Sequence, residues 1–313
     1  MHQLDPALAV WLEAYNRELA ELVAKGYKAT PIGAREALAN LTRQMVTSGP
    51  DIAWVNDDLV PGRDFTVPVR IYHPNPQRAL PVLAFFHGGG HMVGSVSVYD
   101  PICRRLAAAS QHVVVAADYR LAPESPYPAG LQDAAVVAKG LWQALDARGL
   151  PYARELSLAG DSAGGALTSS LSALGQYDAS LRIKRQVLIY PSVDYTLSQP
   201  SVDENGEGYL LTKARVAWYF DNYFQHAENR LQASPLHGGF SRKLPSTLLV
   251  SAGFDPLRDE AFLYADKLRA AEVEVEVEHL HLEGMVHAFL NLEAIVPEVC
   301  REVYQRIGAF LNR

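Results

Sequence analysis

The stretch LSLAGDSAGGALTS, at residues 156–169, places one serine between two different patterns. The run LSLA alternates like a strand that enters a sheet, and the small residues from Ala163 onward have the spacing of a helix packed closely on that sheet. Gly160 and Gly164, two positions before and two after Ser162, would let the strand and the helix approach without Cβ clashes. Ser162 is therefore predicted to lie in a sharp strand-to-helix turn.

A serine in such a turn has a chemical use. The turn projects the side chain away from the backbone, and the helix that follows offers unpaired N–H groups and the positive end of its dipole. The pentapeptide at residues 160–164 matches the G-x-S-x-G nucleophile elbow. A second interpretation is that Ser162 only caps the helix. The glycines match neither G-x-G-x-x-G nor a P-loop.

Composition indicates an ordinary globular protein of 313 residues, with 49% hydrophobic and 20% charged residues, organised as one large domain or two modest ones. A formal charge of −7 without a basic stripe argues against nucleic acid and anionic membranes as partners. Cys103 and Cys300 have no metal-binding or disulfide-framework spacing. The N-terminus does not resemble a signal peptide and no run of 18 apolar residues occurs, so a cytoplasmic protein is expected. A homodimer is left open.

Short apolar runs alternate with helix-length intervals from Trp54 onward. Such strands, rich in Val, Leu and Ile and separated by crossovers, predict a mostly parallel sheet covered by helices on both faces. The first two runs are close enough in sequence to pair antiparallel. The predicted strands are residues 65–72, 81–87, 112–119, 156–160, 185–191, 246–253 and 273–282.

Two segments stand outside this alternation. Residues 1–46 contain two amphipathic helix candidates, the second starting near Thr30 and Pro31. Residues 195–229 contain a polar, glycine-bearing loop and then an aromatic helix candidate at 212–224. We expect both to form a cap over a catalytic core made of residues 47–194 and 230–313.

Ligands of open α/β sheets gather at the carboxyl ends of the strands, so the residues that follow each strand are informative. HGGG at residues 87–90 follows one predicted strand, Ser162 another and Asp255 a third, and His287 lies beyond the last. A serine nucleophile needs an imidazole base and a carboxylate that orients it. The sequence therefore predicts Ser162, His287 and Asp255 as nucleophile, base and orienting acid. The glycines, with the N–H of Ala163, would stabilise the oxyanion.

Other interpretations of single residues remain open. Asp255 precedes a proline and would also cap the next helix, and Asp259 and Glu260 are second choices for the acid. His287 could be a solvated loop histidine. His279 and His281 fall within a strand on its polar face, where the absence of a third ligand nearby argues against a metal site.

Together these motifs resemble the hormone-sensitive-lipase-like (family IV) carboxylesterases of the α/β-hydrolase superfamily. The resemblance rests on HGGG, DYRLAPESPYPAG, GDSAGG, DPLRDE and EGMVHAF, in that order, and spans residues 81–289. It implies an eight-stranded α/β-hydrolase fold with a helical cap. It also implies Ser162, Asp255 and His287 as the triad, and the N–H groups of Gly88, Gly89 and Ala163 as the oxyanion hole. His91 departs from the family, which often has an aromatic residue there, and plant hormone receptors of the family lose the histidine that is present here as His287.

The expected function is a serine carboxylesterase without cofactor or metal that acts on small esters, with acyl chains of about C2 to C8. An amidase or peptidase, and a non-catalytic small-molecule binding protein, are the alternatives. Trp218, Tyr219 and Tyr223 are candidate pocket walls. The aromatic residue before Pro128 favours a cis Tyr127–Pro128 bond.

Overall fold

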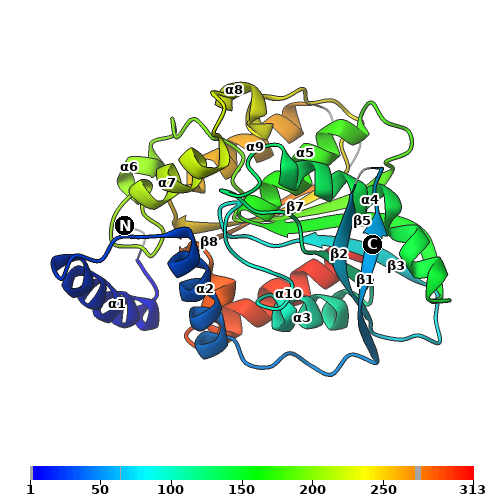
Figure 1. The fold of residues 1–313 in the computed structure, drawn as a ribbon, viewed down its shortest axis with the longest axis horizontal. Helices are drawn as coiled ribbons and strands as arrows, with labels where there is room; N and C mark the ends of the chain where they lie inside the picture. Colours follow the sequence, from blue (N-terminus) through cyan, green and yellow to red (C-terminus); the bar gives the residue numbers. More distant parts are fainter. Residues whose placement is uncertain (1–2, 64, 272–275) are drawn as a thin grey trace.

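A single eight-stranded sheet runs through the computed structural model, which describes residues 3–63, 65–271 and 276–313 (Figure 1). The strand order is β1-β2-β4-β3-β5-β6-β7-β8, and pairing is parallel from β4 to β8. The predicted fold class is confirmed. The strands are β1 (Trp54–Pro61), β2 (Thr66–His73), β3 (Leu80–Phe86), β4 (Val113–Ala117), β5 (Tyr152–Asp161), β6 (Ile183–Ile189), β7 (Ser246–Phe254) and β8 (Val277–Val286).

The antiparallel edge of the sheet differs from the prediction. We expected the runs at 65–72 and 81–87 to pair, but β4 lies between β2 and β3. β2 pairs antiparallel with β1 on one side and with β4 on the other, and β3 pairs parallel with β4 and β5. The prediction was wrong because the helical crossover after β3 returns the chain beside β3, which separates β3 from β2. Residues 273–275 of the last predicted strand lie outside the described residues.

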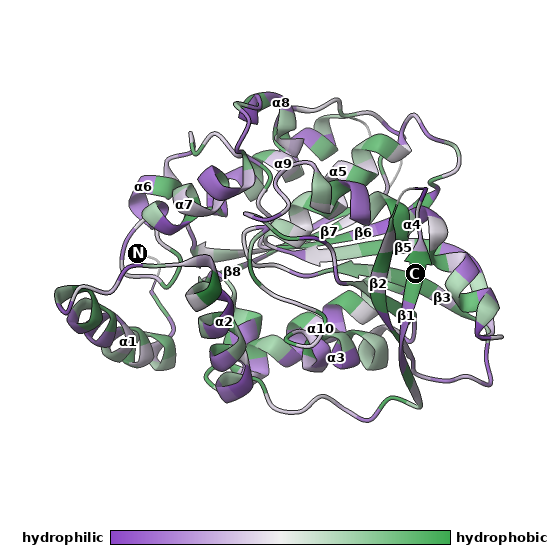
Figure 2. Cartoon of the chain, viewed as in Figure 1, coloured by the Kyte–Doolittle hydropathy of each residue, from purple (hydrophilic) through white to green (hydrophobic). Residues whose placement is uncertain are grey.

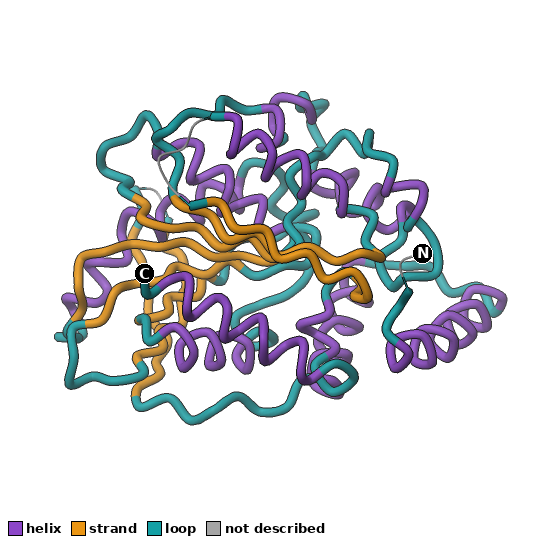
Figure 3. The backbone as a smooth tube through the Cα atoms, turned by 180° about the vertical axis from the view of Figure 1, so that it is seen from behind, coloured by secondary structure: helices purple, strands orange, loops and turns teal. Residues whose placement is uncertain are grey.

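Helices cover both faces of the sheet, as predicted, and Figure 3 shows the strands enclosed between them. β3 and β4 are buried along nearly their whole length because both of their faces pack against helices. Figure 2 shows the apolar centre of the sheet and the polar outer faces of the helices. The lower layer in Figure 1 is α3 (Asp100–Ser110) and α10 (Pro297–Leu311), and the upper layer is α4 (Ala129–Ala147), α5 (Ala163–Gly175) and α9 (Arg258–Ala270).

The N-terminal segment forms α1 (Pro6–Ala24) and α2 (Pro31–Met45), and Thr30 Oγ1 caps α2 by accepting from the N–H of Gly33 at 3.1 Å. After β6 the chain makes α6 (Ser201–Glu204), α7 (Lys213–Tyr223) and α8 (Arg230–Ala233). The two segments touch, since Asn16 Nδ2 donates to the carbonyl of Gly208 at 2.9 Å. The helix candidates predicted in both segments are therefore present, and the two segments lie together. The remaining elements are short 3₁₀ turns at Pro235–His237 and Phe289–Leu292.

The Tyr127–Pro128 peptide bond is cis, which confirms the prediction, and Ala122–Pro123 is a second cis bond that we did not predict. Cys103 and Cys300 are buried free thiols. Within the described ranges, no helix has both the length and the apolar character needed to cross a membrane.

Candidate active site

Ser162 lies in the predicted turn between β5 and α5, with φ 53° and ψ −118°. A non-glycine residue in this region is strained, and strain of this kind is typical of functional sites. The flanking glycines leave no room for a side chain: a Cβ on Gly164 would lie 1.9 Å from the carbonyl oxygen of Phe86, and one on Gly160 would lie 2.2 Å from the carbonyl oxygen of Gly164. The sequence GDSAG therefore forms this turn because β3, β5 and α5 meet there in backbone contact.

Three side chains from distant parts of the chain meet at this turn. His287 Nε2 lies 2.9 Å from Ser162 Oγ, and His287 Nδ1 lies 2.8 Å from Asp255 Oδ2. Ser162 follows β5, Asp255 follows β7 and His287 follows β8, so the carboxyl ends of parallel strands deliver all three. Asp255 and His287 are almost fully buried. The structure thus brings the three predicted residues within hydrogen-bond distance in the order nucleophile, base and acid.

The prediction that Asp255 caps the next helix is wrong, since α9 begins at Arg258, its N-cap position is Leu257 and no side chain caps it. Each carboxylate oxygen of Asp255 nevertheless has its own partner. Oδ1 accepts from the N–H of Leu257 at 2.8 Å, just before α9 begins, while Oδ2 faces His287. The hydrogen bond from Leu257 fixes the carboxylate in place and leaves the second oxygen for the imidazole.

The second-choice carboxylates have other roles. Asp259 accepts from the N–H of Ser201 at 2.9 Å. Glu260 Oε1 accepts from the N–H groups of Val193 and Asp194 at 2.6 and 3.2 Å, and burial raises the pKa of Glu260 well above its ordinary value. Neither residue has a hydrogen bond to His287.

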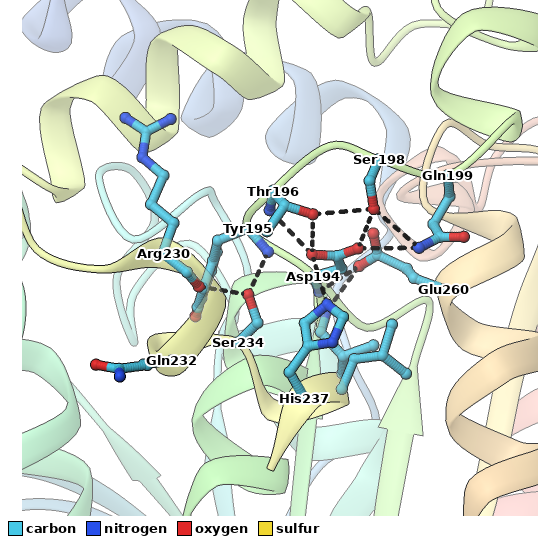
Figure 4. Close-up of polar contacts among 12 residues, drawn as sticks. Asp194, Tyr195, Thr196, Ser198, Gln199, Arg230, Gln232, Ser234, His237 and Glu260 are labelled. Atoms are coloured by element: carbon cyan, nitrogen blue, oxygen red, sulfur yellow. Dashed lines mark hydrogen bonds and ion pairs between the residues drawn. The ribbon is translucent and has the colours of Figure 1, made fainter.

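Figure 4 shows the polar cluster to which Glu260 belongs. The fully buried Asp194 accepts from Thr196, Ser198 and Gln199, and His237 Nε2 lies 3.4 Å away. Burial alone would raise the pKa of Asp194, but the hydrogen bonds, those of Thr196 and Gln199 foremost, hold it below its ordinary value. The cluster fixes the loop after β6, which contacts the turn at Ser162 directly.

Asp161 organises the loop opposite Ser162. Its Oδ1 accepts from the N–H of Gly88 at 2.7 Å and its Oδ2 accepts from the hydroxyl of Tyr99 at 3.0 Å. Burial raises the pKa of Asp161 to about 7. The N–H of Gly88 is therefore already used, which does not fit the prediction that Gly88 faces an oxyanion.

Gly89, Gly90 and Ala163 line the pocket beside Ser162, whereas Gly88 does not. Within the described part of the chain, the N–H groups of Gly89, Gly90 and Ala163 have no acceptor. The ring of Tyr219 packs directly on Gly90, which has φ +60° and leaves no room for a side chain, since a Cβ there would lie 2.4 Å from Tyr219 Cγ.

His91 lies outside the pocket. Its ring stacks on Tyr223 at a centroid distance of 3.9 Å, and its Nε2 lies 3.1 Å from the hydroxyl of Tyr195. Burial, together with the neighbouring His87, lowers the pKa of His91 to about 3, so the ring is neutral. His91 joins the glycine loop at residues 87–90 to α7 by packing on Tyr223.

A pocket of about 180 Å³ opens over Ser162, His287 and Ala163. Of the three predicted wall residues only Tyr219 lines it; Tyr223 is buried against His91, and Trp218 packs among the cap aromatics. Other lining residues were missed by the sequence analysis. The apolar stripe of α2 could have been found from its i, i+4, i+7 spacing, whereas nothing local marked the rest. The missed lining residues include Tyr15, Ala34, Leu38, Leu41, Arg215, Val216 and Phe220.

His279 and His281 both lie on β8, away from this pocket, and their ring nitrogens lie 2.7 and 2.8 Å from Ser251 Oγ. Burial lowers the pKa of His279 to about 4. No group of three or more potential metal ligands occurs among the residues that the structure describes.

Comparison with known proteins supplies independent information. A family model described as alpha/beta hydrolase fold matches residues 83–291. The carboxylic ester hydrolase LipN of Mycobacterium tuberculosis is 37% identical over 257 residues, which cover 78% of this chain and 66% of that protein. The ethyl acetate hydrolase of Pseudomonas putida is 33% identical over 309 residues, 94% of each chain. The solved structure of a hyperthermophilic esterase from Pyrobaculum calidifontis superposes with a TM-score of 0.84 at 34% identity, over 99% of this chain and 98% of that one.

Proposed function

The chain belongs to the hormone-sensitive-lipase-like carboxylic ester hydrolases of the α/β-hydrolase superfamily, and from this premise we propose that it hydrolyses short- to medium-chain esters through Ser162, His287 and Asp255. The observation that carries the proposal is the continuous chain of contacts from Ser162 Oγ through His287 to Asp255, at 2.9 and 2.8 Å. It lies at the floor of a pocket that admits a small ester.

In the proposed mechanism, Ser162 Oγ attacks the ester carbonyl while His287 Nε2 takes its proton. Asp255 holds the imidazole so that Nε2 is free to accept, and its buried charge stabilises the imidazolium. His287 then protonates the departing alcohol and an acyl-enzyme remains. A water molecule, deprotonated by His287, hydrolyses that intermediate and restores Ser162.

The oxyanion formed in each step needs hydrogen-bond donors that are not already in use. We assign this role to the N–H groups of Gly89, Gly90 and Ala163, in place of the set with Gly88 that the sequence suggested. Support comes from the hydrogen bond between Gly88 and Asp161, and from the position of the other three beside Ser162. Asp161 thereby acts as a positioning residue for the oxyanion loop.

The preference for short chains rests on the pocket and on the helices that cover it. Its volume of about 180 Å³ is below the usual range of pockets for drug-sized ligands, roughly 300–1,000 Å³. Side chains of α2 and α7 line it, so we propose that residues 1–46 and 195–229 form a cap on the catalytic core and limit the length of the acyl chain.

The test is a rate comparison on the p-nitrophenyl esters of acetic, butyric, octanoic and palmitic acid, with Ser162→Ala as the control. We expect turnover of the first three, little of palmitate and none with the variant. Preference for palmitate would contradict the pocket argument. Failure to turn over any ester would favour the non-catalytic binder.

A second comparison separates an esterase from an amidase. The amide N-(4-nitrophenyl)butanamide has the same acyl group as p-nitrophenyl butyrate and a poorer leaving group. An esterase should hydrolyse the ester far faster, whereas comparable kcat/KM values for the two substrates would favour the amidase.

A further inference from the structure

Arg215, in the first turn of α7, is the only lysine or arginine among the described residues that line the pocket. It is half-buried, and no carboxylate in the described part of the chain forms an ion pair with it. The ionisable side chains that interact with its guanidinium are three tyrosines, Tyr219, Tyr15 and Tyr27. Two nearby arginines lie outside the pocket and have carboxylate partners. Arg35 of α2 pairs with Glu124, and Arg230 of α8 pairs with Asp221.

A half-buried cation without an anionic partner is costly, and buried charges in proteins are normally paired or bind a ligand. The tyrosine hydroxyls cannot neutralise the guanidinium, although they can donate further hydrogen bonds to an anion. The pocket itself offers no free carboxylate, because both oxygens of Asp161 already accept hydrogen bonds from Gly88 and Tyr99. The missing partner would therefore arrive with the substrate.

The position of Arg215 relative to the reacting atoms follows from α7. Tyr219 packs on Gly90 of the oxyanion loop, and Arg215 precedes Tyr219 by one helical turn on the same face. The Cα atoms of Arg215 and Tyr219 are thus about one turn of helix apart, roughly 5–6 Å, and Arg215 lines the pocket beside the residue that packs on Gly90. A group bound there would belong to the far end of a short substrate.

We propose that this esterase prefers small esters that carry a carboxylate at the end remote from the scissile bond, and that Arg215 binds this carboxylate. The proposal rests on the esterase function proposed above. A guanidinium presents parallel N–H donors that match the two oxygens of a carboxylate, which is why arginine suits this role. The carboxylate can sit on the acyl part or on the alcohol part, and the experiment separates the two.

The test compares pairs of substrates that differ only in a carboxylate or its neutral amide. On the acyl side the pair is monoethyl adipate and ethyl 6-amino-6-oxohexanoate; on the alcohol side it is 6-acetoxyhexanoate and 6-acetoxyhexanamide. Chromatography of the products gives kcat and KM at pH 8. We expect the native protein to prefer the anion in one pair by about tenfold or more, which identifies the side that faces Arg215.

Arg215→Met, which keeps an unbranched apolar stem and removes the charge, should lower kcat/KM for the anionic ester about 10- to 100-fold, mainly by raising KM. It should change kcat/KM for the amide less than about threefold. Arg215→Gln, which keeps hydrogen-bond donors but removes the charge, should give the same loss. Lys213→Met is the matched control, since it removes a cation from the same turn of α7 that is exposed and paired with Asp203. It should leave both substrates unchanged.

If the Arg215 variants lose kcat/KM equally on the anion and on the amide, Arg215 has a purely structural role and the proposal is overturned. A native protein without preference for either anion would also overturn it. So would a Lys213→Met variant with the same loss of kcat/KM. These outcomes leave the esterase function intact, because turnover of ethyl hexanoate and its loss in Ser162→Ala report on that function separately.

Discussion

Replacing Asp255 by asparagine tests the division of work between its two oxygens. The Oδ1 of asparagine can keep the hydrogen bond from the N–H of Leu257, but the amide group then presents Nδ2, a donor, to His287 Nδ1. Nδ1 must become an acceptor, so the ring proton moves to Nε2, which faces Ser162 and can no longer take its proton. The variant should therefore be folded and nearly inactive.

The size of the effect follows from the alternative open to the variant. Rotating the amide to restore the productive tautomer leaves the buried N–H of Leu257 facing another donor, at about 1–3 kcal/mol, and the charge-assisted bond to the imidazolium, about 1.5–3 kcal/mol, is lost as well. The sum of about 2.5–6 kcal/mol corresponds to a decrease in kcat/KM of about 10²- to 10⁴-fold.

The assay is initial-rate hydrolysis of p-nitrophenyl butyrate beside a thermal unfolding scan. Tm should change by less than about 3 °C, because the hydrogen bond from the N–H of Leu257 is retained. Asp259→Asn is the matched control, since it makes the same exchange four residues on, where the carboxylate bonds Ser201 and Arg258. Its rate should stay within a few fold of the native rate. Turnover above a tenth of the native value in Asp255→Asn would refute the assigned role, and an inactive Asp259→Asn variant would show that the loss is not specific to Asp255.

Three further predictions concern the frame of the site. Gly164→Ala should destabilise the protein by about 3 kcal/mol or more, since its Cβ would lie 1.9 Å from a backbone oxygen. Gly140→Ala in α4 should cost much less, since its closest contact is a methyl group of Val60 at 2.8 Å. Urea unfolding of the two variants measures the difference. Because burial raises the pKa of Asp161 to about 7 in the folded protein, against about 3.9 when unfolded, the folded state binds the extra proton, and this residue's contribution to stability is lost as pH rises from about 4 to 7. The free energy of unfolding should accordingly fall between pH 5 and pH 8 by up to about 3 kcal/mol more in the native protein than in Asp161→Asn, and equal slopes would contradict the assignment. Arg35 Nε donates to the carbonyl of Met92 at 3.0 Å, and its Nη2 donates to the carbonyl of Ala122 at 2.9 Å. Arg35→Ala should therefore speed proteolysis within residues 1–46 and weaken the preference for short acyl chains. Arg43→Ala, whose partner Asn40 lies in the same helix, should change neither.

Features that depend on neighbouring residues were predictable. The turn at Ser162 follows from glycines two positions away on each side, and the start of α2 follows from Thr30 and Pro31. The order of HGGG, Ser162, Asp255 and His287 along the chain could be combined with one general rule, that parallel strands end at the same edge of a sheet, and that rule brought the three residues of the site together.

Features set by contacts between distant segments were not. The pairing of β2 depends on β4, some forty residues further on, because a strand joins whichever edge its crossover reaches. Tyr219 and Tyr223 look alike in the sequence, but only Tyr219 lines the pocket, because Tyr223 packs on His91.

The same division holds within the glycine loop. Its composition predicted free backbone N–H groups, since consecutive glycines adopt conformations that other residues avoid. Which of them is free depends on Asp161, 73 positions from Gly88. Its carboxylate accepts from the N–H of Gly88, while Gly89 and Gly90 line the pocket. Periodicity and turn chemistry act over a few residues, so they can be recognised in the sequence itself. The choice of hydrogen-bond partner for Gly88 and the lack of a carboxylate partner for Arg215 are decided only when the packed sheet and its helices bring distant side chains within a few ångströms.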